Sequence, residues 1–369
     1  MPFGVRLKSP TFATGMASKS SSRNWQRTKG KGSPKTLRWV IGILIAALIV
    51  GGYLLLFPNT GSFSKDEFLY IRTGSDYDDV KQALEEGDFV KNMSSFDFLA
   101  KRAGYPGHVR PGKYRIPAGA NNLTLVRLLR SGRQTPVKLV IGKLRTTNDF
   151  IRAVSSQLEA DSTVLRKLLN DPVYLAQFGL KPATALCAVF PDTYEFYWNT
   201  SADKAYRKIA KTASKFWTPA RQNQAHSHGM STEEAMTLAS IVDEETNSNP
   251  EKPLIASVYL NRLKKGMRLQ ADPTARYAAG DFSIKRVTEA QTSIASPYNT
   301  YAVSGLPPGP ICTPSRASVD AVLKAPANSY LYFCAKEDFS GTHRFAATYP
   351  EHMRNARLFQ AALNARNIH

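Results

Sequence analysis

A long uncharged apolar run near the start of the chain is the clearest feature of its hydrophobic pattern. Residues 39–57 (WVIGILIAALIVGGYLLLF) carry no charged side chain, and as a helix they are long enough to cross a hydrocarbon core about 30 Å thick. A cleaved signal peptide is the alternative. Its apolar region would be shorter, about 7–15 residues, and a small-residue cleavage site would follow it, which this run lacks. The pattern therefore predicts a transmembrane helix over residues 39–57.

Shorter periodic segments follow, and they alternate between strand and helix. Alternating apolar positions predict strands over residues 67–72, 112–117 and 136–141. Helical spacing predicts helices over residues 76–84, 96–103, 122–129, 147–158 and 162–169. The order strand, helix, helix, strand resembles the LysM module, a small glycan-binding unit, although unrelated small domains share this order.

These patterns predict an α+β fold class and divide the chain into five parts. From about residue 183 the sequence is typical of an α-rich domain with long polar loops. The parts are a basic tail over residues 1–38, the transmembrane helix over 39–57, a small LysM-like α+β module over 64–142, a helical connector over 143–182 and a larger α-rich domain over 183–369.

One helix of the larger domain ends in three consecutive acids. Ser231 and Glu234 have capping-box spacing, so a helix is expected to begin there. At about 100° per residue, Glu245 lies about 40° from the centre of the apolar face, whereas Asp243 and Glu244 lie about 120° and 140° away. We therefore expect Asp243 and Glu244 to be solvated and Glu245 to be buried.

A buried carboxyl group has a raised pKa, so Glu245 is a candidate general acid near neutral pH. The alternative is a structural role, in which a buried acid pairs with an arginine or caps the end of the helix. The position on the helix does not decide between the two.

Charge is distributed unevenly and changes the interpretation of the whole chain. The sequence has 49 Lys and Arg against 29 Asp and Glu, a net charge of +20. Nine of the basic residues lie in residues 1–38, which contain no acid, and no basic stripe follows. Nucleic-acid binding is therefore not expected. By the positive-inside rule the tail is cytosolic, and in a bacterial inner membrane the rest of the chain faces the periplasm.

Sequence patterns for metal or cofactor binding are missing. Cys187, Cys312 and Cys334 make an odd count, so the chain can form at most one disulfide. No His-x3-His, Cys-x2-Cys or His-Glu-x2-His pattern occurs, and the glycines of residues 305–309 (GLPPG) lie among prolines, unlike those of a phosphate-binding loop. We expect no metal and no cofactor.

Several separate blocks carry a resemblance to a known family. They are residues 238–246 (LASIVDEET), 256–263 (ASVYLNRL), 266–274 (GMRLQADPT), 298–301 (YNTY) and 305–309 (GLPPG), preceded by 110–116 (RPGKYRI) and 190–194 (FPDTY). In order and spacing they resemble the YceG-like family of endolytic murein transglycosylases. The resemblance extends from the membrane helix to near the C-terminus.

The resemblance implies a chemistry and a catalytic residue. In the family the catalytic glutamate is the second acid of an Ile-Val-Glu-x-Glu-Thr pattern, which falls on Glu245; Asp243 stands where glutamate is usual. The reaction implied is cleavage of the β-1,4 bond between N-acetylmuramic acid and N-acetylglucosamine without water, giving a 1,6-anhydro end. Glu245 would serve first as acid and then as base.

The same blocks imply a substrate cleft in the domain of residues 183–369. A turn or packing role is the alternative for each of its residues, and aromatic side chains there are as typical of a core as of a sugar site. Arg262 and Arg276 are candidate partners of Asp272 or of stem-peptide carboxylates, and for Asp192 a structural cap is preferred. The predicted cleft residues are Gln270, Asp272, Thr274, Tyr298, Asn299 and Tyr301.

Two other functions remain open from the sequence. A hydrolytic muramidase would use Asp272 or Asp192 to activate water. A non-catalytic scaffold of the cell-wall machinery would use the small module to hold glycan. The preferred interpretation is a single-pass inner-membrane lyase that acts on peptidoglycan glycan strands, terminates the elongation of nascent strands and has the peptidoglycan synthases of elongation or division as candidate partners.

Overall fold

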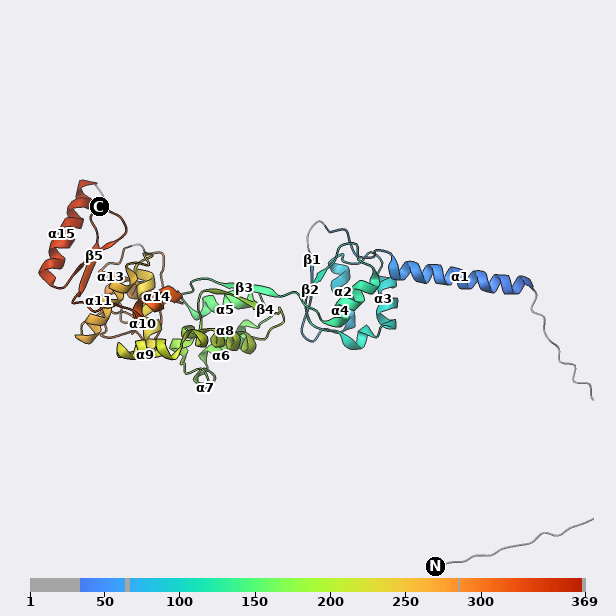
Figure 1. The fold of residues 1–369 in the computed structure, drawn as a ribbon, viewed down its shortest axis with the longest axis horizontal. Helices are drawn as coiled ribbons and strands as arrows, with labels where there is room; N and C mark the ends of the chain where they lie inside the picture. Colours follow the sequence, from blue (N-terminus) through green and yellow to red (C-terminus); the bar gives the residue numbers. More distant parts are fainter. Residues whose placement is uncertain (1–33, 64–66, 285, 367–369) are drawn as a thin grey trace, which may run out of the picture. The chain divides into compact units, whose positions relative to one another are not determined.

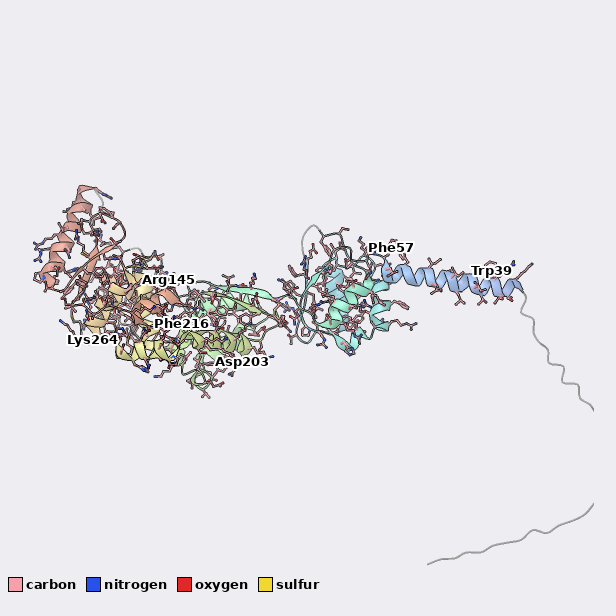
Figure 2. The ribbon with its side chains drawn as sticks, viewed as in Figure 1. Trp39, Phe57, Arg145, Asp203, Phe216 and Lys264 are labelled. Atoms are coloured by element: carbon pink, nitrogen blue, oxygen red, sulfur yellow. The ribbon has the colours of Figure 1, made fainter. Side chains whose placement is uncertain are left out.

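The computed structural model describes residues 34–63, 67–284 and 286–366. Most of the predicted basic tail, residues 1–33, lies outside them. Helix α1 (Pro34–Leu56) stands as a unit of its own. Its stretch Lys35–Tyr53 is long and apolar enough to cross a membrane, and side chains such as Trp39 are exposed (Figure 2). The length and composition of this helix agree with the predicted membrane span.

The first elements after α1 form a small core of their own (Figure 1). Strands β1 and β2 pair antiparallel, with Leu69 opposite Tyr114, and both side chains point into this core. The order strand, helix, helix, strand agrees with the prediction, while the likeness to LysM stays a prediction. The elements are β1 (Glu67–Ile71), α2 (Tyr77–Glu86), α3 (Met93–Arg102), η1 (Tyr105–His108), β2 (Gly112–Ile116) and α4 (Asn122–Ser131).

Strand β3 (Val137–Ile141) packs with later elements and not with the small core. It pairs antiparallel with β4 (Asp192–Phe196), and its inward side chains Leu139 and Ile141 belong to the larger core. The small module predicted over residues 64–142 includes this strand, because its distant partner strand leaves no local signal in the sequence. The elements between and after the two strands are α5 (Thr147–Ser155), α6 (Ser162–Asn170), α7 (Pro172–Ala176), η2 (Pro182–Ala188) and α8 (Ala202–Phe216).

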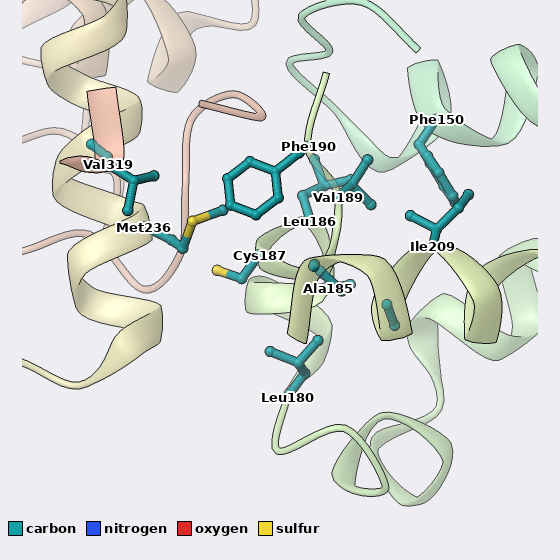
Figure 3. Packing of buried hydrophobic residues seen from close by; sticks show 14 of the residues in the cluster. Phe150, Leu180, Ala185, Leu186, Cys187, Val189, Phe190, Ile209, Met236 and Val319 are labelled. Carbon is teal, nitrogen blue, oxygen red and sulfur yellow. The ribbon is translucent and has the colours of Figure 1, made fainter. Parts of the chain in front are cut away.

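Helix α10 (Thr232–Glu245) lies at the centre of the remaining elements (Figure 1). It begins as predicted: the Ser231 hydroxyl accepts from the Glu234 amide at 3.2 Å, and the Ser231 amide donates to the Glu234 carboxylate at 2.8 Å. Figure 3 shows Met236 of this helix reaching the ring of Phe190. Its surroundings are α9 (Pro219–Ser227), α11 (Lys252–Lys264), α12 (Asp272–Ala279) and α14 (Arg316–Leu323).

The last elements that the structure describes are a hairpin and a helix. Strands β5 (Tyr332–Ala335) and β6 (His343–Ala346) pair antiparallel, and α15 (Tyr349–Ala365) packs on both. A short helix, α13 (Glu289–Thr292), lies in the long loop before α14. The fold is thus a mixture of helices and small antiparallel sheets.

Gly309→Ala is expected to destabilise the fold strongly. A Cβ atom at Gly309 would lie 1.9 Å from the Ala183 carbonyl oxygen, and backbone atoms of η2 cannot move aside cheaply. We expect a loss of about 3 kcal/mol in the free energy of unfolding. Thermal unfolding of the detergent-solubilised protein measures it, with Gly142→Ala as control because nothing lies within 4 Å of its added Cβ. Equal melting temperatures for both variants would contradict the packing described.

Candidate active site

Glu245 is the last residue of α10 and faces α11. The Tyr259 hydroxyl donates a hydrogen bond of 2.5 Å to its Oε1. Tyr259 is buried, whereas Glu245 keeps part of its surface accessible. The carboxyl group is therefore held by the Tyr259 hydroxyl in a residue that is not completely buried.

The pKa of Glu245 is raised to about 7. Removal from water is the main cause, the hydrogen bond from Tyr259 opposes it, and the negative charge of Asp272 adds to the increase. The positive charges of Arg276 and Arg262 lower the pKa by smaller amounts. Near neutral pH the group can therefore both give and take a proton, which a residue serving as acid and then as base requires.

Asp272 and Tyr301, two predicted cleft residues, lie next to Glu245. Asp272 begins α12, and the Tyr301 hydroxyl donates to its Oδ1 at 2.6 Å. The charge of Asp272 raises the pKa of Glu245, and the charge of Glu245 in turn raises the pKa of Tyr301. Burial first, and then the hydrogen bond to Asp272, raise the pKa of Tyr301, so this hydroxyl keeps its proton and remains a donor. These three predicted residues come together as one polar cluster.

Two other predicted contact residues, Thr274 and Asn299, lie inside the protein. Thr274 and Asn299 have no exposed surface. The Thr274 hydroxyl donates to the Ala271 carbonyl, and the Asn299 amide donates to the carbonyls of residues 291, 292 and 294. Both side chains bond to the backbone near Asp272 and Tyr301, which favours the turn or packing role that was the alternative for them.

Gln270 and Tyr298 lie at the edges of this cluster. Gln270 is exposed and has a φ of 51°, a left-handed conformation that non-glycine residues adopt at a cost of about 1–3 kcal/mol and that is concentrated at functional sites. It stays a predicted substrate contact. Tyr298 is half-buried and packs on Tyr277 with ring centroids 4.7 Å apart, which favours the packing role.

The candidate ion partners are arranged differently from the expectation. Arg262 donates to the carbonyl oxygens of Leu331 and Leu269, both at 2.7 Å, and not to Asp272. Asp192 forms an ion pair with Arg316 at 2.8 Å, which gives it a structural role. Arg276 acts on Glu245 through its charge.

Asp243 is buried, so the expectation that it is solvated is wrong. Lys252 donates to its Oδ1 at 2.7 Å, Ser315 donates at 3.0 Å, Ser318 donates as well, and Lys143 lies 3.2 Å from Oδ2. Burial alone would raise the pKa of Asp243, but these hydrogen bonds and charges outweigh it and lower the pKa to about 2. Asp243 is a fixed anion that joins α10 to α11 and α14.

Glu244 is not solvated either. Its carboxylate lies 2.9 Å from Arg145 and 3.3 Å from Lys143, and only 11% of its side chain is exposed. The helical projection failed for both acids because it does not consider the elements that cover α10: Asp243 meets α11 and α14, and both acids meet Lys143 from the segment between β3 and α5. Sequence reasoning also missed Tyr259 and Lys252; each lies close to Glu245 or Asp243 in sequence, but only packing reveals the contacts.

A cavity of about 730 Å³ lies at the other end of α10, near Ser231, Glu234 and Leu263. The 14 residues of the helix span about 20 Å, so this cavity is not the place of the acid chemistry. The raised pKa and the contacts of Glu245, rather than cavity size, identify the candidate site.

The raised pKa of Glu245 predicts a pH-dependent stability. The folded pKa of about 7 lies above the ordinary 4.5, so the folded state holds the proton more tightly. The resulting stability is complete below pH 4.5 and is lost as the pH rises through 7, by about 3 kcal/mol. Glu245→Gln removes this dependence. The melting temperature of the variant, relative to that of the wild type, should therefore increase as the pH rises from 4.5 to 7.5. A constant difference over this range would contradict the raised pKa.

Comparison with known proteins agrees with the blocks described above. The family model described as YceG-like family matches residues 69–358. A Bacillus subtilis protein named endolytic murein transglycosylase is 28% identical over 326 residues, covering 84% of this chain and 89% of that protein. A Streptococcus pneumoniae protein with the same name is 26% identical over 350 residues, and the match covers 85% of this chain but only 63% of that protein.

A solved structure shares the fold. The crystal structure of a yceG-like protein from Listeria monocytogenes matches with a TM-score of 0.53 and 29% sequence identity, covering 79% of this chain and all but 1% of that one. Since the family model spans most of the sequence, the chain belongs to the YceG-like family.

Proposed function

We propose that the chain is a peptidoglycan lytic transglycosylase that cuts within glycan strands and leaves 1,6-anhydro ends. The relatives named endolytic murein transglycosylase support the reaction class. The observation that carries the proposal is the carboxyl of Glu245, which has a pKa of about 7 and is held by Tyr259 at the edge of a polar cluster.

One residue then serves both steps of the reaction. Protonated Glu245 gives its proton to the bridging oxygen while the bond to C1 of the muramyl residue breaks, leaving an oxocarbenium-like centre. Glu245, now a carboxylate, takes the proton of the C6 hydroxyl, whose oxygen forms the new bond to C1. The anionic Asp272 lies near enough to stabilise the positive charge in between.

Product analysis tests the proposal against a hydrolytic muramidase, in which Asp272 would activate water. Purified sacculi are digested with the protein, and the masses of the released fragments are measured by mass spectrometry. A lyase leaves muramyl ends that are lighter by one water than the reducing ends left by a hydrolase. Anhydro ends are the expected product, and reducing ends would assign the muramidase. If no cleavage occurs, the non-catalytic scaffold that holds glycan is the function that remains.

We infer that α1 is a membrane anchor with residues 1–38 in the cytosol and the catalytic domain in the periplasm, because the basic residues precede the apolar stretch. A short tether keeps the site near the membrane surface, where strands are made. This location favours termination of strand elongation and makes the peptidoglycan synthases candidate partners. The small module is proposed to hold glycan near the site.

A fusion reporter checks this topology. Alkaline phosphatase joined to the C-terminus is expected to be active, because the enzyme folds only outside the cytosol, whereas the same reporter joined after Arg38 is expected to be inactive. Activity of the second fusion alone would show the opposite topology, with the catalytic domain in the cytosol and separated from peptidoglycan.

A further inference from the structure

Tyr259 is held both by the packing of its ring and by the hydrogen bond of its hydroxyl. It lies on α11 with 1% of its surface exposed. Its ring meets the edge of Phe333 from β5, with centroids 5.8 Å apart at 87°. Its hydroxyl has one acceptor, Oε1 of Glu245, at 2.5 Å. The two packed elements thus aim one donor at one oxygen of the catalytic candidate.

The bond distinguishes the two oxygens of Glu245. Because Oε1 accepts from Tyr259, the acidic proton of the neutral carboxyl lies on Oε2. Once that proton has left, the same bond stabilises the carboxylate, since a hydrogen bond to an ionised acceptor is stronger than one to a neutral acceptor. Burial and the adjacent Glu245 raise the pKa of Tyr259, so its hydroxyl stays a donor throughout.

We propose that Tyr259 is the positioning residue of this reaction: it holds Oε1 so that Oε2 is the oxygen that gives the proton to the glycosidic bond and then takes one from the C6 hydroxyl. The inference rests on the proposed function. Tyr259 does not itself touch the reacting atoms. It sets the direction in which Glu245 presents its proton and the ease with which the carboxylate forms.

Other titratable groups also act on Glu245. The charged ones are Asp272 and Arg276 from α12 and Arg262 from α11, and the neutral Tyr301 lies in the loop before α14. A change at position 259 leaves them in place. Loss of the Tyr259 hydroxyl therefore removes a stabilising contact of the carboxylate and should raise the pKa of Glu245.

The test compares Tyr259→Phe with the wild type in the full-length, detergent-solubilised protein. Because Glu245 must begin protonated, activity on sacculi falls as the pH rises past its pKa. In Tyr259→Phe this fall should move up by roughly one to two pH units, and the maximal rate should drop roughly 10- to 100-fold. The matched control is Tyr206→Phe, because Tyr206 is equally buried but donates to the Ala185 carbonyl instead. It should lower stability without moving the pH profile.

A spectroscopic readout separates this inference from the proposed function. The carbonyl stretch of protonated Glu245, identified as the infrared band absent from Glu245→Gln, is titrated in both proteins whether or not they cut glycan. Its midpoint should rise in Tyr259→Phe. Site-specific 3-fluorotyrosine at position 259 is a stronger hydrogen-bond donor of nearly the same size, so it should lower the midpoint. This variant replaces Tyr259→Phe in the test if the Phe variant fails to fold. Unchanged midpoints and pH profiles in both variants would overturn the positioning role, while absence of cleavage by the wild type would overturn only the proposed function.

Discussion

Glu245→Gln is expected to lose nearly all cleavage of sacculi while the protein stays folded. Gln has the same shape and can still accept the hydrogen bond from Tyr259, but it cannot deliver or take the proton. General acid–base catalysis contributes about 10²- to 10⁴-fold, and a residue serving both steps can contribute more. Anhydro ends formed per hour measure the loss, and a melting curve checks the fold.

Glu234→Gln is the matched control for this variant. It makes the same substitution at the other end of the same helix, and Gln can still receive the Ser231 amide in the capping box. Its activity should stay close to that of the wild type. Near-normal anhydro product from well-folded Glu245→Gln would contradict the mechanism, and a loss in both variants would point to a disturbed helix.

The largest expected effect on stability comes from the buried pair of Asp243 and Lys252. Both residues are almost without exposed surface, and their charged atoms lie 2.7 Å apart. Asp243→Asn keeps the shape but leaves the Lys252 ammonium buried without its counter-charge, and Lys252→Met leaves Asp243 with Lys143 as its remaining cation. Removing one partner of such a pair costs about 3–5 kcal/mol.

Thermal unfolding of the single variants and of the double variant Asp243→Asn/Lys252→Met measures this pair. The double variant should be less destabilised than the sum of the two single changes, because it leaves no uncompensated charge. Arg207→Met is the control. It removes an ion pair with Asp203 that is about half exposed, so the expected cost is below about 1 kcal/mol. Single variants as stable as this control would show that the buried pair contributes little.

Local signals predicted much of the fold. The capping residues of α10 and the strand and helix periods before residue 170 are short-range features, and the structure reproduces them. The pairing of β3 with β4 was missed because the two strands are joined only by tertiary packing. A strand pattern gives a face and a length, but it does not identify the partner.

At the candidate site, too, local sequence patterns predict some features, while others depend on tertiary packing. Helical projection put Glu245 on the apolar face, but it treated α10 as a helix with one solvent face, and Asp243 is buried with two lysines beside it. Thr274 and Asn299 lie in the blocks that resemble the family, yet their bonds go to the protein itself. A motif indicates which residue type occupies a position, whereas burial and contacts indicate whether that residue has a structural role or could bind substrate.

Digestion of sacculi in oxygen-18 water tests the central claim most directly. In the mechanism proposed here the C6 hydroxyl of the substrate attacks C1, so the new muramyl ends should be anhydro ends that carry no heavy oxygen. A hydrolase takes its nucleophile from the solvent. Muramyl ends that carry one heavy oxygen from water would contradict the account.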